Sequence, residues 1–400
     1  MTKFERNKYA GLFLIFILVL LIIISVGMFV SLHTDPVDNA LEAQSVINTL
    51  FVVEEDSQVL VTEILMYYPV LKRGAMFEIP GNIGAIYEIL DRTDRIDAVY
   101  TESGIEAYKA EIEKLTKVDI PFTVEISMDS FCQLTDLLGG FKVYVPFAVD
   151  VTEEDGRRRL LPNGAVSLDG DKIRDFMYYK LPDEDEDALS QRRQEAFIAF
   201  LSAFNRNGSQ MLEKNNFRKL SYLFRSNLEK SSLNRLLQNI SNVDGESLTP
   251  NTVRGVPGTT SDGKKVLFPY YGGTLVKETI SMMMTNLVSS DEISFSRTYV
   301  LNIFNGTGVQ GLARNTSVLL RGVGYEINRT DNSEQSYEKT VIINHIGSEN
   351  NDVAKSLGDF IHCDNIIQDE AQSEDADYDS GSVVDFTIIL GSDFDGRYVR

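Results

Sequence analysis

One uncharged apolar run dominates the hydrophobic pattern of the chain and lies close to its start. Residues 9–32 read YAGLFLIFILVLLIIISVGMFVSL. A helix rises about 1.5 Å per residue, so a run of this length can cross a hydrocarbon core of about 30 Å. The run is longer than the 7–15 apolar residues typical of a signal peptide, and no A-x-A-like cleavage site follows it. The pattern therefore favours an uncleaved transmembrane helix over 9–32, with a cleaved signal peptide as the alternative.

Charges on the two sides of this run predict its orientation. Basic residues dominate before it and acidic residues follow it: Lys3, Arg6 and Lys8 with the single Glu5, then Asp35 and Asp38. The positive-inside rule places residues 1–8 in the cytoplasm. The sequence therefore predicts a single-pass protein of the cytoplasmic membrane, with residues 33–44 as a linker and the body in the periplasm or at the cell surface.

Helical and alternating patterns follow one another in the next stretch, 45–288. Two β-rich runs within 45–68 flank the polar segment EEDSQ, which predicts a pair of strands. Apolar residues recur every three or four positions over 104–117, which predicts a helix, and every second position over 122–128, which predicts a half-buried strand. The same alternation recurs over 141–147. This mixture predicts an α/β sandwich with a mixed central sheet.

The end of this stretch carries a second strong helical pattern. A helix follows Arg193, with four apolar side chains on one side: Phe197, Phe200, Leu201 and Phe204. Residues 255–263 (GVPGTTSDG) are expected to form a turn-rich loop. An amphipathic run over 274–287 then closes the first domain.

A polar joint at 289–297 introduces a second, smaller domain over 298–400. Strand patterns occupy 299–304, 340–344 and 384–390, and a helix is expected over 312–320. These elements predict a compact α/β unit. The acidic stretch 369–379 is expected to be a solvated loop rather than a metal cage.

Composition narrows the classes of function. The chain has 59 acidic residues against 38 Lys and Arg, a net charge of −21 and a pI near 4.6. Nucleic acid is excluded as an expected partner, because its binding depends on clustered Lys and Arg. The two cysteines, Cys132 and Cys363, are far apart, and the three histidines are scattered, so neither a zinc site nor a Ser-His-Asp triad is indicated. Any catalysis must use carboxylates, arginine and a metal.

Two segments carry a family resemblance. Residues 134–145 (LTDLLGGFKVYV), followed by 161–170 (LPNGAVSLDG), resemble the LytR-CpsA-Psr family over about residues 45–287. In the second domain, VLNIFNGTGVQGLA at 300–313 and IILGSDF at 388–394 resemble the LytR C-terminal domain that often follows. The resemblance implies a membrane-anchored enzyme that transfers a glycopolymer from a polyprenyl-pyrophosphate carrier to the cell wall. The implied partners are a polyprenyl-linked glycopolymer, peptidoglycan and other envelope proteins.

The resemblance also supplies candidate site residues. Arg193 and Gln194 match the end of the family's R-x-x-R-Q motif, and Lys180 keeps one cation of its Y-x-R-x-R strand. All three are candidates for phosphate binding, and Arg193 is expected to open a helix whose N-terminal amides favour anions. Asp187 matches an acidic position of the family, and with Asp185 it is a candidate ligand of Mg²⁺. The alternatives are a surface cap at Arg193, a solvated strand end at Lys180 and a flexible acidic loop at 183–187.

Departures from the family pattern concentrate on charged positions. Gly81 and Asn82 stand where I-P-R-D has its Arg and Asp, Ser190 replaces the first Arg of R-x-x-R-Q, and the usual R-S-D-T is replaced near 61–63. Two functions therefore stay open. One is an enzyme, either a glycopolymer phosphotransferase or a polyprenyl-pyrophosphate phosphatase. The other is a pseudoenzyme or scaffold that binds polyprenyl lipid, peptidoglycan or an envelope protein. An open apolar tunnel beside Arg193 would favour a lipid ligand, and a filled core would favour the scaffold.

Overall fold

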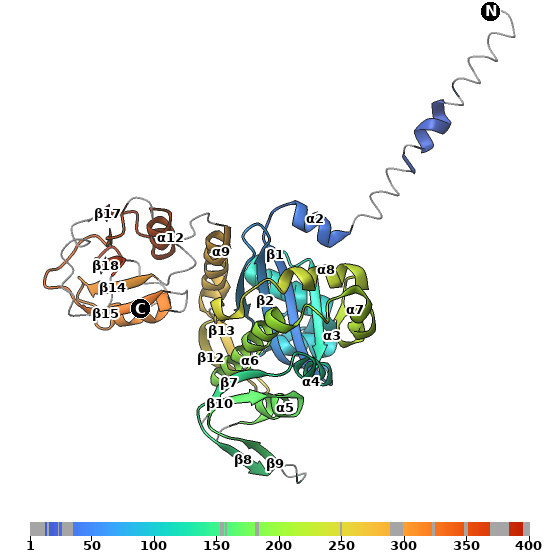
Figure 1. Cartoon of the computed structure of the whole chain (residues 1–400). Helices are drawn as coiled ribbons and strands as arrows, with labels where there is room; N and C mark the ends of the chain where they lie inside the picture. The colour runs from blue at the N-terminus through green and yellow to red at the C-terminus, as the bar shows by residue number, and fades with distance from the viewer. Residues whose placement is uncertain are drawn as a thin grey trace, which may run out of the picture.

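Two successive α/β units form the body of the chain (Figure 1). The computed structural model describes residues 13, 16–22, 24–25, 35–152, 156, 158–180, 184–248, 250–288, 299–321, 325–347, 351–368 and 384–394. Of the predicted anchor, residues 16–22 are described and helical, and most of the remainder lies outside the described residues. None of the described helices combines the length and the apolar character needed to cross a bilayer. The anchor therefore stays a prediction.

A five-stranded mixed sheet forms the centre of the first unit. Its strands are β1 (Ile47–Glu55), β2 (Gln58–Tyr68), β3 (Arg73–Glu78), β6 (Phe122–Ser127) and β11 (Arg225–Ser226), in the order β11-β6-β1-β2-β3. β1 is parallel to β6, and the other neighbours are antiparallel. The strand pair predicted within 45–68 and the strand predicted over 122–128 are confirmed.

Helices cover both faces of this sheet. One face packs against α3 (Ile96–Thr116) and α9 (Thr274–Val288), and the other against the helices α4 (Met128–Leu137), α5 (Gly170–Tyr178), α6 (Glu186–Asn207), α7 (Lys214–Leu220) and α8 (Lys230–Ile240). Because side chains alternate along a strand, Phe51 and Val53 enter the core on the α6 side, whereas Leu50 and Val52 enter the core on the α3 side. The predicted α/β sandwich with a mixed central sheet is confirmed. A short helix, α2 (Pro36–Glu42), precedes β1 and packs against α8.

Small two-stranded sheets surround the sandwich. They are β4 (Gly84–Tyr87) with β5 (Arg92–Arg95), β7 (Phe141–Val145) with β10 (Gly164–Leu168), β8 (Val149–Thr152) with β9 (Arg158–Leu161), and β12 (Gly255–Thr259) with β13 (Lys265–Pro269). The β8–β9 hairpin projects from the body (Figure 1). The last pair corrects the loop expected at 255–263, since its glycines belong to a strand and to the turn at Gly263. Single turns of 3₁₀ helix lie at η1 (Glu88–Leu90), η2 (Ser221–Leu223), η3 (Gly245–Ser247) and η4 (Tyr270–Gly273).

The two motifs that carry the family resemblance have structural roles here. Gly140 has φ +77°, and a Cβ atom there would lie 2.6 Å from the carbonyl oxygen of Leu168. Asp169 caps α5, and the backbone N–H of Gly170 donates to Asp136 Oδ1 at 2.7 Å. The turn and the Leu-Asp-Gly motif therefore hold α4, β7 and α5 together.

The second unit is a five-stranded sheet with helices. Its elements are β14 (Val300–Asn305), α11 (Leu312–Arg321), β15 (Glu326–Asn332), β16 (Val341–Asn344), α12 (Asn351–Ile361), β17 (Ile366–Gln368) and β18 (Phe386–Leu390), and the strand order is β15-β14-β18-β16-β17. The three strands and the helix predicted from the pattern are all present. The acidic stretch 369–379 lies outside the described residues, and the domain boundaries stay predictions.

Candidate functional site

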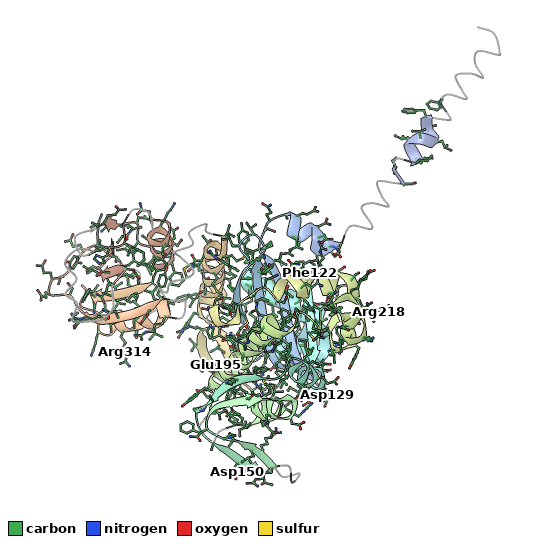
Figure 2. The ribbon with its side chains drawn as sticks, in the orientation of Figure 1. Phe122, Asp129, Asp150, Glu195, Arg218 and Arg314 are labelled. Carbon is green, nitrogen blue, oxygen red and sulfur yellow. The ribbon has the colours of Figure 1, made fainter. Side chains whose placement is uncertain are left out.

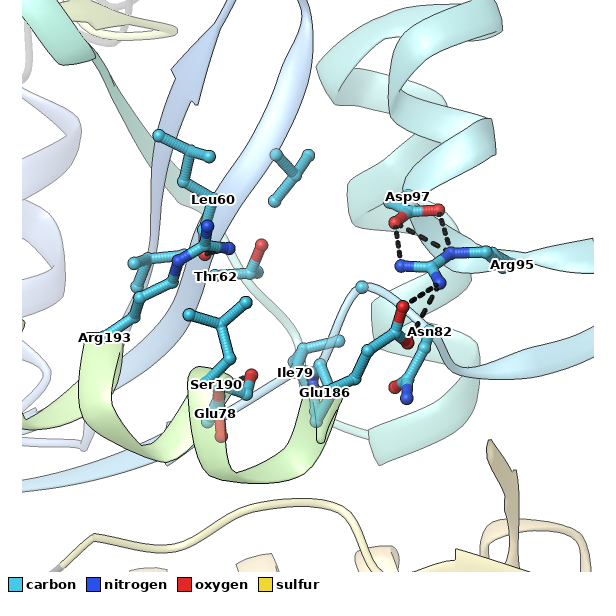
Figure 3. A pocket seen from close by; sticks show the side chains of 15 residues that line it. Leu60, Thr62, Glu78, Ile79, Asn82, Arg95, Asp97, Glu186, Ser190 and Arg193 are labelled. Carbon is cyan, nitrogen blue, oxygen red and sulfur yellow. Dashed lines mark hydrogen bonds and ion pairs between the residues drawn. The ribbon is translucent and has the colours of Figure 1, made fainter. Parts of the chain in front are cut away.

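A pocket of about 100 Å³ opens where four parts of the first unit meet. The start of β2, the loop after β3, the start of α3 and the first two turns of α6 line it. Figure 3 shows Arg193 on one side of the pocket and Arg95 on the other, with Ser190 and Glu78 between them. This is the region where the family motifs predict the phosphate site, because it contains Gly81, Asn82 and Arg193.

Arg95 is an ion-paired cation at one side of the pocket. Its Nη2 lies 2.7 Å from Asp97 Oδ2, and its Nη1 lies 3.0 Å from Glu186 Oε2. Burial lowers the pKa of Arg95, but the bonds to Asp97 and Glu186 outweigh burial and raise it overall. The guanidinium thus joins the start of α3 to the first turn of α6. Its charge is already compensated by two carboxylates.

Arg193, at the other side, has a different environment. Its Nε donates to the carbonyl oxygen of Met177 at 2.9 Å, and its Nη1 donates to that of Leu60 at 3.4 Å. It forms no ion pair with any residue in the described part of the chain. Burial, followed by the neighbouring charge of Arg192, lowers the pKa of Arg193 to about 10. The pocket therefore contains one guanidinium that is available to an anion.

The prediction that Arg193 opens a helix is wrong. α6 begins at Glu186, where the side chain of Asp185 accepts a hydrogen bond from the backbone N–H of Ala188 at 2.8 Å. The unpaired backbone N–H groups of a helix lie in its first turn. Arg193 stands in a later turn, so its own side chain, and not the helix terminus, faces the pocket.

The neighbouring Arg192 is a structural residue. Its Nε lies 2.8 Å from Glu184 Oε1, and its Nη2 donates to the carbonyl oxygen of Tyr179 at 2.6 Å. The guanidinium also stacks 3.7 Å from the ring centroid of Tyr179. Only 7% of Arg192 is exposed, and it does not line the pocket. Both adjacent arginines thus bond to carbonyl oxygens near the end of α5, but Arg192 is ion-paired and lies outside the pocket, whereas Arg193 lines it.

Two buried carboxyl groups, one of which lines the pocket, were not among the candidate residues. Glu63 on β2 is the cross-strand partner of Glu78 on β3, and their exposed fractions are 0% and 3%. Gln194 Nε2 donates to Glu63 Oε2 at 3.3 Å, and Ser190 Oγ donates to Glu78 Oε1. Burial raises the pKa of both groups, and the proximity of Glu78 raises that of Glu63 further. The signals in the sequence are an acidic residue within each of two apolar strands and, for Glu63, its place in the segment that replaces R-S-D-T.

The other candidate residues lie outside the pocket lining. Lys180 is exposed beyond the end of α5, and Gln194 is buried with its amide nitrogen bonded to Glu63 and to the carbonyl oxygen of Asn251. Asp185 is the cap of α6. Burial and then the charge of Asp185 raise the pKa of Asp187, which is hydrogen-bonded to Asn82. Of the five candidates only Arg193 lines the pocket, and the role of each stays a prediction.

The described residues do not provide a preformed Mg²⁺ site. In the part of the chain that the structure describes, no three His, Cys, Asp or Glu side chains are grouped to hold a metal ion. Asp97 and Glu186 are engaged by Arg95, and Asp185 caps a helix. Asp183 of the acidic segment 183–187 lies outside the described residues.

Aromatic side chains fill the core between the sheet and α6. Phe197 lies 5.6 Å from Phe51 between ring centroids, and Phe200 lies 4.8 Å from Phe131 and 6.4 Å from Phe141. All five side chains are at most 3% exposed. Rings at these separations are in contact, as in a close-packed core. These five side chains therefore belong to the close-packed core between the sheet, α4 and α6.

Two family models match the chain in the same order as its two units. Residues 70–284 match the LytR_cpsA_psr family, and residues 298–394 match the model described as LytR cell envelope-related transcriptional attenuator. No curated protein matches the chain.

Solved structures support the fold of the first unit. The crystal structure of Bacillus subtilis TagV is 16% identical, with a TM-score of 0.52, and the match covers 60% of this chain and 98% of that one. Protein gbs0355 from Streptococcus agalactiae is also 16% identical, with a TM-score of 0.53, and the match covers 62% of this chain and 90% of that one. At this identity the likeness shows the fold alone.

Proposed function

Because the chain belongs to the LytR_cpsA_psr family, we propose that it is a membrane-anchored protein of cell-envelope biogenesis whose body lies outside the cytoplasm and binds a partner without transferring phosphate. The family supplies the cell-envelope setting, and the apolar run at 9–32 with its flanking charges supports the anchor. Peptidoglycan or another envelope protein is the proposed partner, since the aromatic packing between the sheet and α6 disfavours a polyprenyl tail.

The balance of charge in the pocket carries this proposal. Three carboxyl groups, those of Glu78, Asp97 and Glu186, line the pocket together with two guanidinium groups, those of Arg95 and Arg193. Even if Glu78 is protonated, the remaining charges only cancel. A pyrophosphate carries several negative charges and needs a surplus of cations. Each missing charge-assisted hydrogen bond removes about 1.5–3 kcal/mol of binding free energy.

The catalytic part of the proposal is tested by turnover. The full chain in detergent is incubated with a polyprenyl pyrophosphate and Mg²⁺, and released phosphate is measured beside an Arg193→Ala variant. We expect both proteins to match the protein-free background. Release by the wild type that is lost in the variant would establish a catalytic pocket and contradict the proposal.

The location is tested separately. Ser209 is exposed, so a Ser209→Cys variant can be treated in intact cells with a maleimide that does not cross membranes. We expect labelling without lysis, with the unsubstituted chain as control. If the Ser209→Cys variant is labelled only after lysis, the body lies in the cytoplasm and the proposed location is wrong.

Arg193 favours a second candidate function, the phosphotransferase or phosphatase that the family resemblance implies. A half-buried arginine without an ion-paired partner among the described residues, beside a pocket, is a suitable contact for one phosphate oxygen. The Mg²⁺ expected with this activity would take most of its ligands from phosphate and water, as Mg²⁺ commonly does. The same turnover measurement separates the two functions.

A further inference from the structure

An exposed basic surface lies on α7 and α8. Residues 206–235 contain seven Lys or Arg and two Glu, a local net charge of +5 in a chain of net charge −21. The exposed cations of these two helices are here named the basic face. They are Lys214, Arg218 and Lys219 on α7, and Lys230 and Arg235 on α8. Figure 1 shows the two helices side by side, and Figure 2 shows Arg218 at the outer edge of the unit.

Most of this charge is not compensated within the described part of the protein. Lys214, Arg218, Lys219 and Lys230 form no ion pair with any residue in the described ranges, whereas Arg235 pairs with Asp38. The two acidic residues of the segment, Glu213 and Glu229, stand at the N-caps of α7 and α8. The basic face thus offers these four cations to a partner outside the body.

The face is distinct from the pocket. The N-terminal part of α6, which begins at Glu186, lines the pocket. The helix α7 comes after the C-terminal end of α6 at Asn207. A helix of 22 residues is about 33 Å long at 1.5 Å per residue. A ligand held in the pocket therefore does not explain the cations of α7 and α8.

The predicted anchor brings this face close to a bilayer. Asp35 Oδ2 accepts from Ser232 Oγ at 3.0 Å, Arg235 Nε lies 2.5 Å from Asp38 Oδ1, and Val37 is fully buried. These contacts fix α2 on α8. The predicted span ends at residue 32 and α2 begins at Pro36; the few residues between them reach about 10 Å at most.

We infer that the basic face of α7 and α8 binds the anionic headgroups of the bilayer in which the chain is anchored. The inference rests on the anchor proposed above. Basic residues next to a membrane anchor are attracted to anionic lipid, and the attraction falls off within a Debye length. A lipid surface is favoured over a soluble acidic polymer because the short connection holds the face beside the bilayer.

Lysine reactivity in bilayers tests the inference. The full chain is reconstituted in nanodiscs of phosphatidylcholine, with or without phosphatidylglycerol, and acetylation rates are measured by mass spectrometry. We expect at least threefold slower acetylation of Lys214, Lys219 and Lys230 in the anionic discs, reversed by high salt. The exposed Lys142 and Lys339 should react equally in both and serve as internal controls.

Each other outcome has a definite meaning. Equal rates at Lys214, Lys219 and Lys230 in both discs would overturn the inference and leave the anchor intact. Failure of the chain to enter discs would contradict the proposed anchor, and the inference with it. If a soluble glycerol-phosphate polymer slows the reaction and phosphatidylglycerol does not, the face binds an acidic polymer and the inference is overturned.

A charge variant provides an independent measurement. Phosphatidylglycerol should slow amide hydrogen exchange in α7 and α8 of the wild type. It should not slow this exchange in K214Q/R218Q/K219Q/K230Q. The matched control K142Q/K339Q should keep the protection seen in the wild type. Protection that survives in the quadruple variant would overturn the inference.

Discussion

Glu63 and Glu78 face each other across two antiparallel strands, and both carboxyl groups are almost completely buried. Two carboxylates in such a position cannot both be ionised without a large desolvation and repulsion cost. The folded state therefore binds protons here more tightly than the unfolded state. Glu78 of this pair lines the pocket and is hydrogen-bonded to Ser190 there.

A Glu63→Gln substitution should stabilise the protein at neutral pH. Folding raises the pKa of Glu63. The contribution of this group to the free energy of unfolding is therefore complete below the pKa of the unfolded state, and it is lost as pH rises toward and through the pKa of the folded state. The neutral amide removes that loss. We expect the free energy of unfolding at pH 7 to rise, because the amide stays neutral where the buried carboxyl group must either ionise or hold a proton. Urea unfolding between pH 4 and 8 measures the slope, which should flatten. An unchanged slope would contradict this expectation; the exposed Glu334→Gln substitution is the control.

The adjacent arginines should respond to the same substitution to different degrees. Arg192→Met removes the ion pair with Glu184 and the hydrogen bonds to the carbonyl oxygens of Phe176 and Tyr179, and should cost about 3–5 kcal/mol of stability. Arg193→Met removes a half-buried cation that has no ion-paired carboxylate in the described structure but donates to the carbonyl oxygens of Met177 and Leu60, so the loss should be no more than about 1 kcal/mol. Urea midpoints of the two variants provide the comparison. Equal losses would show that Arg193 also has a structural role.

The two glycines of the turn after α4 provide a matched pair. Gly139 and Gly140 both have left-handed φ values, +79° and +77°, so alanine at either should cost about 1–2 kcal/mol. A Cβ at Gly139 meets nothing within 4 Å, whereas a Cβ at Gly140 lies 2.6 Å from the carbonyl oxygen of Leu168. Gly140→Ala should therefore lose about a further 1–3 kcal/mol. Thermal unfolding of both variants tests this, and equal melting temperatures would be the contrary result.

Restoring one cation should improve anion binding. Ser190→Arg places a guanidinium beside Glu78 and Arg193, at the position where the family motif has its first Arg. We expect inorganic pyrophosphate to bind about tenfold more tightly, which corresponds to one charge-assisted hydrogen bond. Isothermal titration calorimetry measures the change, with Ser209→Arg on the distant surface as control. If Ser190→Arg binds no better than that control, the charge balance does not limit the pocket.

The periodic patterns predicted the sheet and most helices because burial imposes these periods directly. The strands of 45–68 and the helix over 274–287 were found in this way. The start of α6 was missed because its first turn is polar and only Asp185 signals the cap. β15 was missed since it is an edge strand of mainly exposed polar residues, without alternation.

The site was predictable only in part. Arg193 could be found from a motif, but the division of roles between Arg192 and Arg193 depends on which side of α6 faces α5. The pairing of Glu63 with Glu78 depends on strand register, because a shift of one residue would send either side chain to the opposite face. Register and helix rotation are properties of the folded chain, and local patterns do not specify them.

Arg95 also determines how the pocket can respond to an occupant. One guanidinium fastens the beginnings of two helices, so an anion that captures it must take the place of Asp97 or Glu186. If Glu186 is displaced, the first turn of α6 loses its attachment to α3. Binding of an anion to Arg95 would then free the first turn of α6 from α3, because the anion replaces the carboxylate of Glu186 as the partner of Arg95.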